Sequence, residues 1–488
     1  MLQKIKGFHL FPSDDRNKKQ VLFCLTLITF LASLPQLCGY IGSGEKLARY
    51  LQHIEMIKEG ITNGQFYILM EPMQEAGYAD TVFCCNILFF VQALLRVLGV
   101  SVTAGYSIYC IMLNVLTTWI AWYCFGKIFQ SNSVGLVCSA LYTLSIPRIY
   151  RLVVAGAVEE VSALMFLPFI VYGLYCVLLE EQEKKRNGAP WVSLVVGYTG
   201  LIQTHLLTYE ITLCITVLIC LLCVRKLFCR SAFPELLKGI YAAAGLSMWY
   251  CIPLVDSYLR NDRLSHDAIQ GNGLFITQVL YQFWGLASKG VKGDSGMMAA
   301  NPDGVGFVLF FGLVVFAAMW FQGYFLSQEE GCFRLAKISC VFGFVLLCMT
   351  LRNFPWDRIQ RLNCLSSVLV GELKSPDRLL GWALTFLVTV FGFCLWYFRN
   401  REGYFYWIGI GLAIFTVIFG SMSLMESLIT GESSGIVYDL EAWRTVDGAE
   451  ASFCIFDGPW YWVTGEIITV GTVLGIGIRW WRKRRKKA

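Results

Sequence analysis

Charged residues are scarce in this chain. They make up 15% of its 488 residues, whereas soluble globular domains carry about 25%. Hydrophobic residues reach 56%, and the mean hydropathy is +0.57. No stretch between the apolar runs is long enough to form a soluble catalytic domain. The composition therefore excludes a soluble globular protein and indicates a chain that crosses a membrane many times.

Signatures of nucleotide and metal binding are also missing. The chain has no Walker loop, no G-x-G-x-x-G that opens a helix, and no array of C-x-x-C pairs of the kind that binds zinc. No charge pairs line mid-span positions as they do in proton-coupled carriers, and no inverted repeat is visible. We identify no cofactor and no metal ligands, and we leave open whether a divalent metal is needed.

The 19 cysteines lie mostly inside apolar runs, where they behave as small hydrophobic residues. Two exceptions, Cys364 and Cys454, fall in loops that we place outside the membrane. A disulfide between these two is one option, and two free thiols are the other.

Apolar runs close to membrane-spanning length recur from residue 21 to residue 481. A bilayer core needs about 20 mostly apolar residues per helix. The runs are continuous rather than alternating, which favours helices over a barrel. The candidate spans are 21–41, 82–98, 104–125, 133–147, 160–179, 190–204, 206–224, 238–256, 305–325, 335–351, 379–398, 404–421 and 463–481.

Thirteen crossings would place the two basic tails on opposite sides, which conflicts with the basic inner loops expected from the positive-inside rule. Segment 82–98 is short and carries Asn86, Gln92 and Arg96. We therefore predict that it is a juxtamembrane or re-entrant helix on the outer side. The predicted fold is an all-α polytopic membrane protein with about 12 transmembrane helices and both termini in the cytoplasm.

This topology divides the chain into five parts and makes the outer loops the large ones. The parts are a cytoplasmic basic tail (1–20), a polytopic membrane domain (21–430, with a first outer loop at 42–103), an outer loop (431–462), a last transmembrane helix (463–481) and a second cytoplasmic basic tail (482–488). Because both basic clusters adjoin a span, we read them as membrane anchors and expect no nucleic-acid partner.

The first outer loop opens with an amphipathic pattern over residues 44–65. Apolar residues recur at helical spacing, which predicts a helix lying at the membrane interface. The polar side of that helix is either a solvated face or the rim of an active site. The residues on it are Glu45, Lys46, Arg49 and His53.

Further polar groups gather in the other outer segments. Arg148, Arg151 and Glu160 flank a short turn, either as a structural ion pair or as a phosphate site, since a guanidinium fits an oxyanion well. His205 interrupts an apolar stretch of more than thirty residues, as a structural hydrogen-bonding residue or as a catalytic one. The segment 354–383 is basic for an outer loop, which suits either a lipid phosphate or an interfacial helix with cationic anchors.

The order of these motifs resembles a known family. The motifs are A-L-L-R-x-L-G at 93–99, R-x-x-R-L at 148–152, E-x-x-A-x-x-F-L-P-F at 160–169, T-H-L-L-T at 204–208, F-P-W-D at 354–357 and S-P-D-R-L-L at 375–380. Together they are similar to the bacterial multi-pass proteins labelled 6-pyruvoyl-tetrahydropterin synthase-related, which are akin to YfhO-type proteins and resemble the GT-C glycosyltransferase superfamily. The resemblance covers roughly residues 20–430.

This resemblance implies a GT-C-like helical core and a polyprenyl-phosphate-linked sugar as donor. It also implies an essential acid in the first outer loop, where the family pattern reads G-H-D-L-x-x-H-L-x-R. Here Lys46 stands at the aspartate position and Glu45 at the preceding one. A helix turns about 100° per residue, so Glu45 is not an automatic replacement.

From these residues we expect a glycosyltransferase that moves a sugar from a polyprenyl-phosphate donor to an envelope glycan or lipid acceptor. The expected location is the outer face of a bacterial cytoplasmic membrane. The alternatives are a non-catalytic binder or transporter of lipid-linked saccharide and a structural subunit of an envelope assembly. The expected catalytic residues are Glu45, Glu160 and His205, and the expected substrate-binding residues are Arg148, Arg151, Asp357 and Arg378, gathered at one outer cavity.

The topology can be tested by labelling single cysteines in a cysteine-free background with a reagent that does not cross the membrane. A cysteine at Ser43 should react from outside, and cysteines at Asn187 and Ala488 should react only after the membrane is opened. Reaction of position 187 from outside would contradict the topology.

Overall fold

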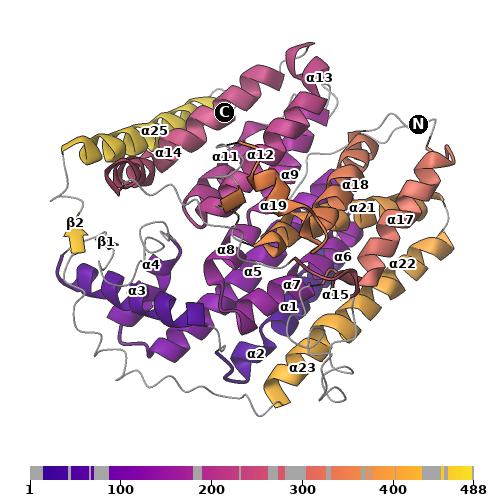
Figure 1. Cartoon of the computed structure of the whole chain (residues 1–488), viewed down its shortest axis with the longest axis horizontal. Coiled ribbons are helices and arrows are strands. Elements are labelled where there is room, and N and C mark those ends of the chain that lie inside the picture. Colours follow the sequence, from indigo (N-terminus) through magenta and orange to yellow (C-terminus); the bar gives the residue numbers. More distant parts are fainter. Residues whose placement is uncertain are drawn as a thin grey trace.

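The computed structural model describes residues 15–41, 45–64, 68–70, 87–179, 190–229, 232–261, 273–280, 304–325, 331–363, 370–371, 373, 375–401, 403–430, 452–454 and 460–485. Most of them are helical (Figure 1). The helices are α1 (Asp15–Ala32), α2 (Leu34–Leu37), α3 (Glu45–Thr62), α4 (Phe89–Val97), α5 (Val102–Phe129), α6 (Asn132–Thr143), α7 (Ile146–Ile149), η2 (Tyr150–Val154), α8 (Val158–Leu164), α9 (Leu167–Leu174), η3 (Tyr175–Leu179), α11 (Trp191–Ile202), α12 (Leu206–Leu222), α13 (Val224–Cys229), α14 (Ala232–Asn261), α15 (Ile276–Leu280), α17 (Phe307–Phe321), α18 (Gly331–Thr350), α19 (Trp356–Gln360), η4 (Pro376–Leu379), α21 (Leu380–Arg401), α22 (Gly403–Thr416), η5 (Val417–Met422), α23 (Ser423–Thr430) and α25 (Trp460–Arg485).

Within the described residues, the named strands form one small ribbon. Strand β1 (Ile68–Met70) pairs antiparallel with β2 (Ser452–Cys454). The all-α prediction did not include this ribbon. It joins a segment near the start of the chain to one near the end, and we had placed the loops that contain them on the same side.

Several described helices have the length and apolar composition needed to cross a bilayer, as expected for a multi-pass membrane protein. Five do so as continuous segments, and a sixth candidate is a pair bent by 46° near Pro147. The predicted number of 12 crossings remains a prediction. The five are Val102–Phe129, Val158–Leu179, Gly331–Thr350, Pro376–Arg399 and Gly403–Glu426, and the bent pair is Asn132–Thr143 with Ile146–Val154.

The segment at 82–98 contains only the nine residues of α4 as a described helix. At 1.5 Å per residue, such a helix is about 14 Å long, roughly half the thickness of a bilayer core. Helix α4 packs against α3 of the first outer loop and against α5. These features suit the juxtamembrane or re-entrant helix predicted from the sequence.

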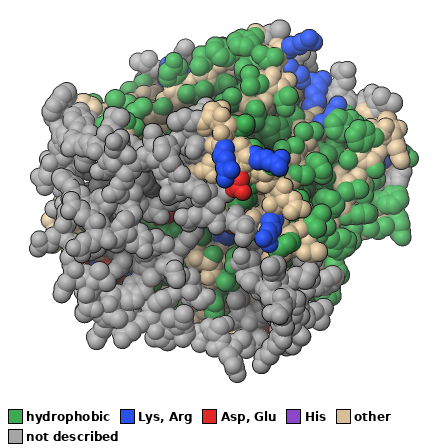
Figure 2. Space-filling model, in the orientation of Figure 1, with side chains coloured by type: hydrophobic (Ala, Val, Ile, Leu, Met, Phe, Trp, Pro, Cys, Tyr) green, Lys and Arg blue, Asp and Glu red, His purple; other side chains and the backbone are tan. Residues whose placement is uncertain are grey.

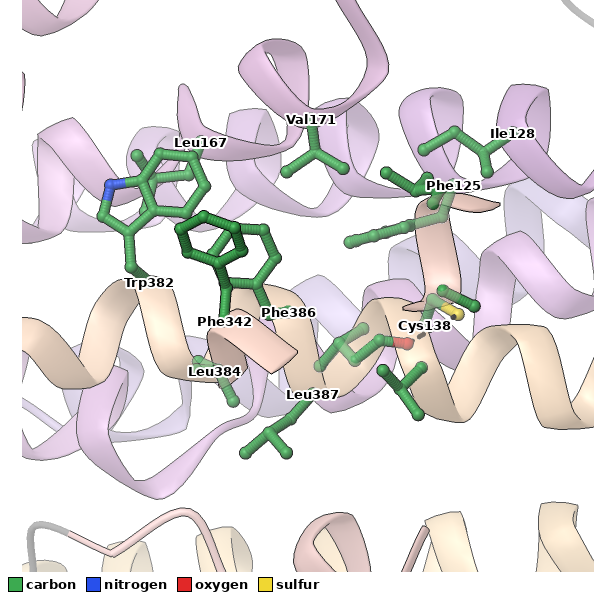
Figure 3. Packing of buried hydrophobic residues seen from close by; sticks show 14 of the residues in the cluster. Phe125, Ile128, Cys138, Leu167, Val171, Phe342, Trp382, Leu384, Phe386 and Leu387 are labelled. Carbon is green, nitrogen blue, oxygen red and sulfur yellow. Dashed lines mark hydrogen bonds between the residues drawn. The ribbon is translucent and has the colours of Figure 1, made fainter. Parts of the chain in front are cut away.

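Helix α21 occupies the centre of the bundle and is almost completely buried. It contacts α18, α17, α6 and α5. Figure 3 shows Trp382 and Phe386 of α21 near Phe342 of α18 and Leu167 of α9. In lipid, such close packing rather than the hydrophobic effect holds helices together. The rigid centre therefore positions whatever lies at the two ends of α21.

Contacts between distant segments bring together regions that we had placed on one side. Ile87 N donates to Gln203 O (3.0 Å), and Leu274 pairs with Leu351, so segments that we placed on the outer side meet each other. At the opposite end, Arg399 hydrogen-bonds to Ser131. Which of these two ends faces the cytoplasm remains a prediction.

Candidate functional site

Two of the predicted site residues, Arg151 and Glu160, form a buried ion pair. Arg151 lies in η2, a π-helical turn of a kind often found at functional sites. Gly156, at φ +62°, then reverses the chain into α8, and a side chain there would be strained. Glu160 falls in the first turn of α8, where the helix dipole favours a carboxylate.

Asp377 completes this group, although the sequence interpretation had not singled it out. One Arg151 nitrogen, Nη2, donates to the backbone oxygen of Asp377 (2.6 Å) and lies 3.5 Å from Oδ2 of its carboxylate. The other nitrogen, Nη1, contacts Glu160. Ser375 caps η4 by position, and its hydroxyl hydrogen-bonds to Asp377. We call Arg151, Glu160 and Asp377 the triad.

The signal for Asp377 was present in the motif S-P-D-R-L-L. The proline at position 376 starts a helical turn, and the next residue then lies in that first turn, where acids are favoured. The contact itself joins residues 226 positions apart. No local pattern can show that Asp377, rather than Asp357, reaches Arg151.

Arg378 follows Asp377 directly and is half-buried. Among the described residues, its guanidinium has no carboxylate within 4.0 Å, since the ion pairs involve other residues. A half-buried guanidinium whose own charge is not paired with a described carboxylate is well suited to bind an external anion.

Arg148 lies one turn before Arg151 but is completely enclosed. It donates to the Thr143 backbone oxygen and to the Thr117 hydroxyl, each at 3.1 Å. These bonds tie α7 to α5 and α6. An external phosphate could reach Arg148 only after a rearrangement of these helices, so the described contacts give it a structural position.

His205 is the N-cap of α12. Its Nδ1 accepts the backbone N–H of Thr208 (3.3 Å), and the Thr208 hydroxyl lies 2.7 Å from the same nitrogen. An Nδ1 that accepts a backbone N–H carries no proton, so this geometry assigns the ring proton to Nε2. His205 is thus a capping residue here.

One hydrogen bond links the helix of His205 to that of Arg378. Trp382 Nε1 donates to Thr212 Oγ1 (2.9 Å). Trp382 lies one turn after Arg378, and Thr212 lies two turns after His205. His205 and Arg378 therefore each lie within two helical turns of the hydrogen bond that joins α12 to α21.

Asp357 lies on the short helix α19, between α18 and η4, and its side chain is exposed. It is not part of the triad. Among the described residues, no group of three or more His, Cys, Asp or Glu side chains is arranged to hold a metal ion.

Helix α3 covers the turn between Arg151 and Glu160. Leu47 is fully buried, and a Cβ built on Gly156 would lie 3.0 Å from the Leu47 Cβ and 3.1 Å from its backbone nitrogen. The first turn of α3 therefore lies against the triad turn. The side chains of Glu45 and Lys46 fall outside the described residues, as does Asp80.

An ion pair fastens α3 to α4. Arg96 Nη2 lies 3.3 Å from Glu55 Oε2, with a second contact between Arg96 Nε and Glu55 Oε1. Burial acts to raise the pKa of Glu55, but hydrogen bonds and charges from Arg96 and Lys58 outweigh it and lower that pKa. The ring of His53, 6.0 Å from that of Phe89, has its pKa lowered to about 4 by desolvation.

The site therefore combines a triad of one guanidinium and two carboxylates, a second guanidinium without an acid partner among the described residues, and a covering amphipathic helix. Such a group can bind an anionic headgroup at Arg378 and hold it against a rigid acid–base framework.

Neither a known family model nor a curated protein matches the chain. Two solved structures share some of its architecture. One is the archaeal oligosaccharyltransferase AglB from Archaeoglobus fulgidus with an inhibitory peptide and a dolichol-phosphate, at 11% identity and a TM-score of 0.41, covering 85% of this chain and 56% of that chain. The other is the apo Archaeoglobus fulgidus oligosaccharyltransferase, at 10% identity and a TM-score of 0.42, covering 94% and 64%. This chain thus spans less than two thirds of either protein, and such scores carry no argument about activity.

The triad predicts a non-additive response to mutation. Arg151→Met should destabilise the full chain by about 3–5 kcal/mol, because it leaves the buried Glu160 carboxylate without the arginine. Glu160→Met should cost less, because Arg151 keeps its contact with Asp377. The double variant should lose less than the sum. Denaturation of the purified protein in mixed micelles measures this. The exposed pair Lys238–Glu235 is the matched control and should contribute under about 1 kcal/mol. Additive losses would contradict the pairing.

The α3–α4 contact should weaken in acid. The folded-state pKa of His53 lies below its ordinary value of 6.5, and the folded-state pKa of Glu55 is also lowered. Each side chain therefore stabilises the fold at pH values above its own ordinary pKa. As the pH falls from about 6.5 to 4, His53 must take up a proton at a cost, and Glu55 adds its loss at lower pH. The hydrogen-exchange protection factors of residues 45–64, taken relative to the intrinsic rate at each pH, should then fall more than those of α5. His53→Asn should remove the part between pH 6.5 and 4, and equal protection factors at both pH values in the wild type would refute this account.

Proposed function

We propose that this protein is a membrane glycosyltransferase that uses a sugar carried on a polyprenyl phosphate. The observation that carries the proposal is the triad with Arg378 beside it, at one end of the central helix of a membrane bundle. The resemblance of the sequence motifs to GT-C-type proteins supports the same reading. The acceptor is an envelope glycan or lipid on the outer face of a bacterial cytoplasmic membrane.

In this proposal, Arg378 binds the phosphate that leaves with the polyprenyl chain. A guanidinium stabilises the negative charge that grows on that phosphate as the bond to the sugar breaks. Arg151 is held by two carboxylates and therefore has little charge left for a phosphate. Its role is to fix the Asp377–Arg378 backbone in place, and Glu160 in turn holds Arg151.

The general base is a separate question. Glu160 is engaged with Arg151 in a buried ion pair, so we look for the base among the other acids. Glu45 opens α3, two residues before the contact between Leu47 and Gly156. We assign the base role to Glu45, which would remove the proton from the acceptor hydroxyl. His205, held as an N-cap, would orient the acceptor.

The second candidate is a protein that binds or moves lipid-linked saccharide without catalysis. The observation that favours it is Lys46, which stands at the family's aspartate position. Near neutral pH a lysine cannot serve as base unless it is strongly desolvated.

An assay separates the two candidates. The purified full chain in lipid nanodiscs would be supplied with labelled polyprenyl-phosphate sugars and an envelope lipid extract. Glu45→Gln should reduce transfer by about 10²–10⁴-fold, the usual loss for one general base. Lys46→Ala should have a smaller effect. Glu59→Gln, a matched change at an exposed position of the same helix, should leave transfer intact.

Full activity of Glu45→Gln would overturn the base assignment. Absence of transfer by the wild type with every donor, together with binding of the lipid that Arg378→Gln weakens, would favour the non-catalytic candidate.

A further inference from the structure

A second group of arginines, separate from the triad, lies on the loop between α18 and η4. Arg352, Arg358 and Arg361 all have exposed side chains. We call them the arginine patch. Figure 2 shows basic side chains around an acidic one near the middle of the face, at the position of α19 in Figure 1.

Backbone hydrogen bonds hold the start of the arginine patch in place. Leu274 N donates to Thr350 O (2.8 Å), and Arg352 N donates to Leu274 O (2.9 Å). The guanidinium of Arg352 lies 5.2 Å from the ring of Phe275. These contacts hold the backbone of Arg352 and one face of its side chain, so the ordering cost of binding at this position is reduced.

Helix α19 is held in a similar way. Trp356 Nε1 donates to Met349 O (2.9 Å), and the ring of Trp356 lies 4.8 Å from that of Phe354. Arg358 and Arg361 are three residues apart and therefore lie on neighbouring positions of one helical face.

The patch carries excess positive charge. Asp357 is the one acid among residues 351–363, so the segment has three arginines against one carboxylate. Among the described residues, none of the three arginines lies within 4.0 Å of a carboxylate, because every recorded ion pair lies elsewhere. A local excess of arginines over acids favours an anionic partner.

The expected depth of the arginine patch in the membrane indicates which anionic partner it binds. Helix α18 has 20 residues, about 30 Å, which equals the thickness of a bilayer core. Arg352 follows the end of α18 by two residues, so a bilayer crossed by α18 would have its headgroups at the level of Arg352. Next to Arg361, the side chain of Leu362 is 73% exposed, which suits contact with lipid better than contact with a soluble glycan.

We propose that the arginine patch binds the phosphate headgroups of anionic phospholipids, such as phosphatidylglycerol, in the leaflet at this end of the bundle. Guanidinium groups pair well with phosphate oxygens. Bound lipid would hold the loop that leads into Asp377 and Arg378 against the membrane surface. The proposal does not depend on the protein being a transferase.

The test measures binding of single lipids to the full chain in detergent by native mass spectrometry. The wild type should bind phosphatidylglycerol more tightly than the zwitterionic phosphatidylcholine. The triple variant Arg352→Gln, Arg358→Gln, Arg361→Gln should raise the apparent Kd for phosphatidylglycerol by about tenfold to a hundredfold, given the usual contribution of each surface arginine. Asp357→Asn should lower that Kd, because it removes the opposing charge.

A matched variant tests whether the effect is local. Arg225→Gln removes one positive charge from an exposed position in α13. It should leave the apparent Kd within about twofold of the wild type. If the triple variant does not fold, the single exposed changes Arg358→Gln and Arg361→Gln replace it.

Three results would overturn the proposal. The first is equal affinity of the wild type and the patch variants for phosphatidylglycerol. The second is full competition by sn-glycerol 3-phosphate at the same concentration, which would indicate a site for free phosphate. The third is displacement of the lipid by an acidic oligosaccharide, which would indicate a glycan surface. None of these results bears on transfer, so failure here is distinguishable from failure of the proposed function.

Discussion

The contact of Arg151 with Glu160 and Asp377 is the constraint on which the rest of the site depends. It joins the turn before α8 to the turn before α21, and α21 is the central helix of the bundle. One guanidinium between two carboxylates leaves the triad with a net charge of −1, and Arg151 is fully engaged within it. The triad is therefore a framework, and binding of an external anion falls to its neighbour Arg378.

Further contacts attach neighbouring helices around the triad. Trp382 and Thr212 tie α21 to α12, whose first turn is capped by His205. Leu47 places the first turn of α3 against Gly156, and the Glu55–Arg96 pair fastens the other part of α3 to α4. Helix α3 is thus attached at two points. Its position relative to the triad depends on both.

Arginine serves three different purposes in this protein. Arg148 is enclosed and links three helices, Arg151 is neutralised by acids, and Arg378 and the arginine patch keep their charge available. The side chain is the same in each case. Burial and the supply of carbonyls or carboxylates decide whether a guanidinium stabilises the fold or binds a partner.

The sequence by itself determined the helical membrane architecture, since long apolar runs can satisfy their backbone only as helices, and each of the thirteen runs overlaps a described helix. It also pointed to Arg151 and Glu160, which lie close in the chain. Tertiary structure alone decided that Asp377 completes the triad and that Arg148 is enclosed. Those outcomes depend on how η4 and α7 pack against distant helices, and side-chain spacing along one segment carries no information about such contacts.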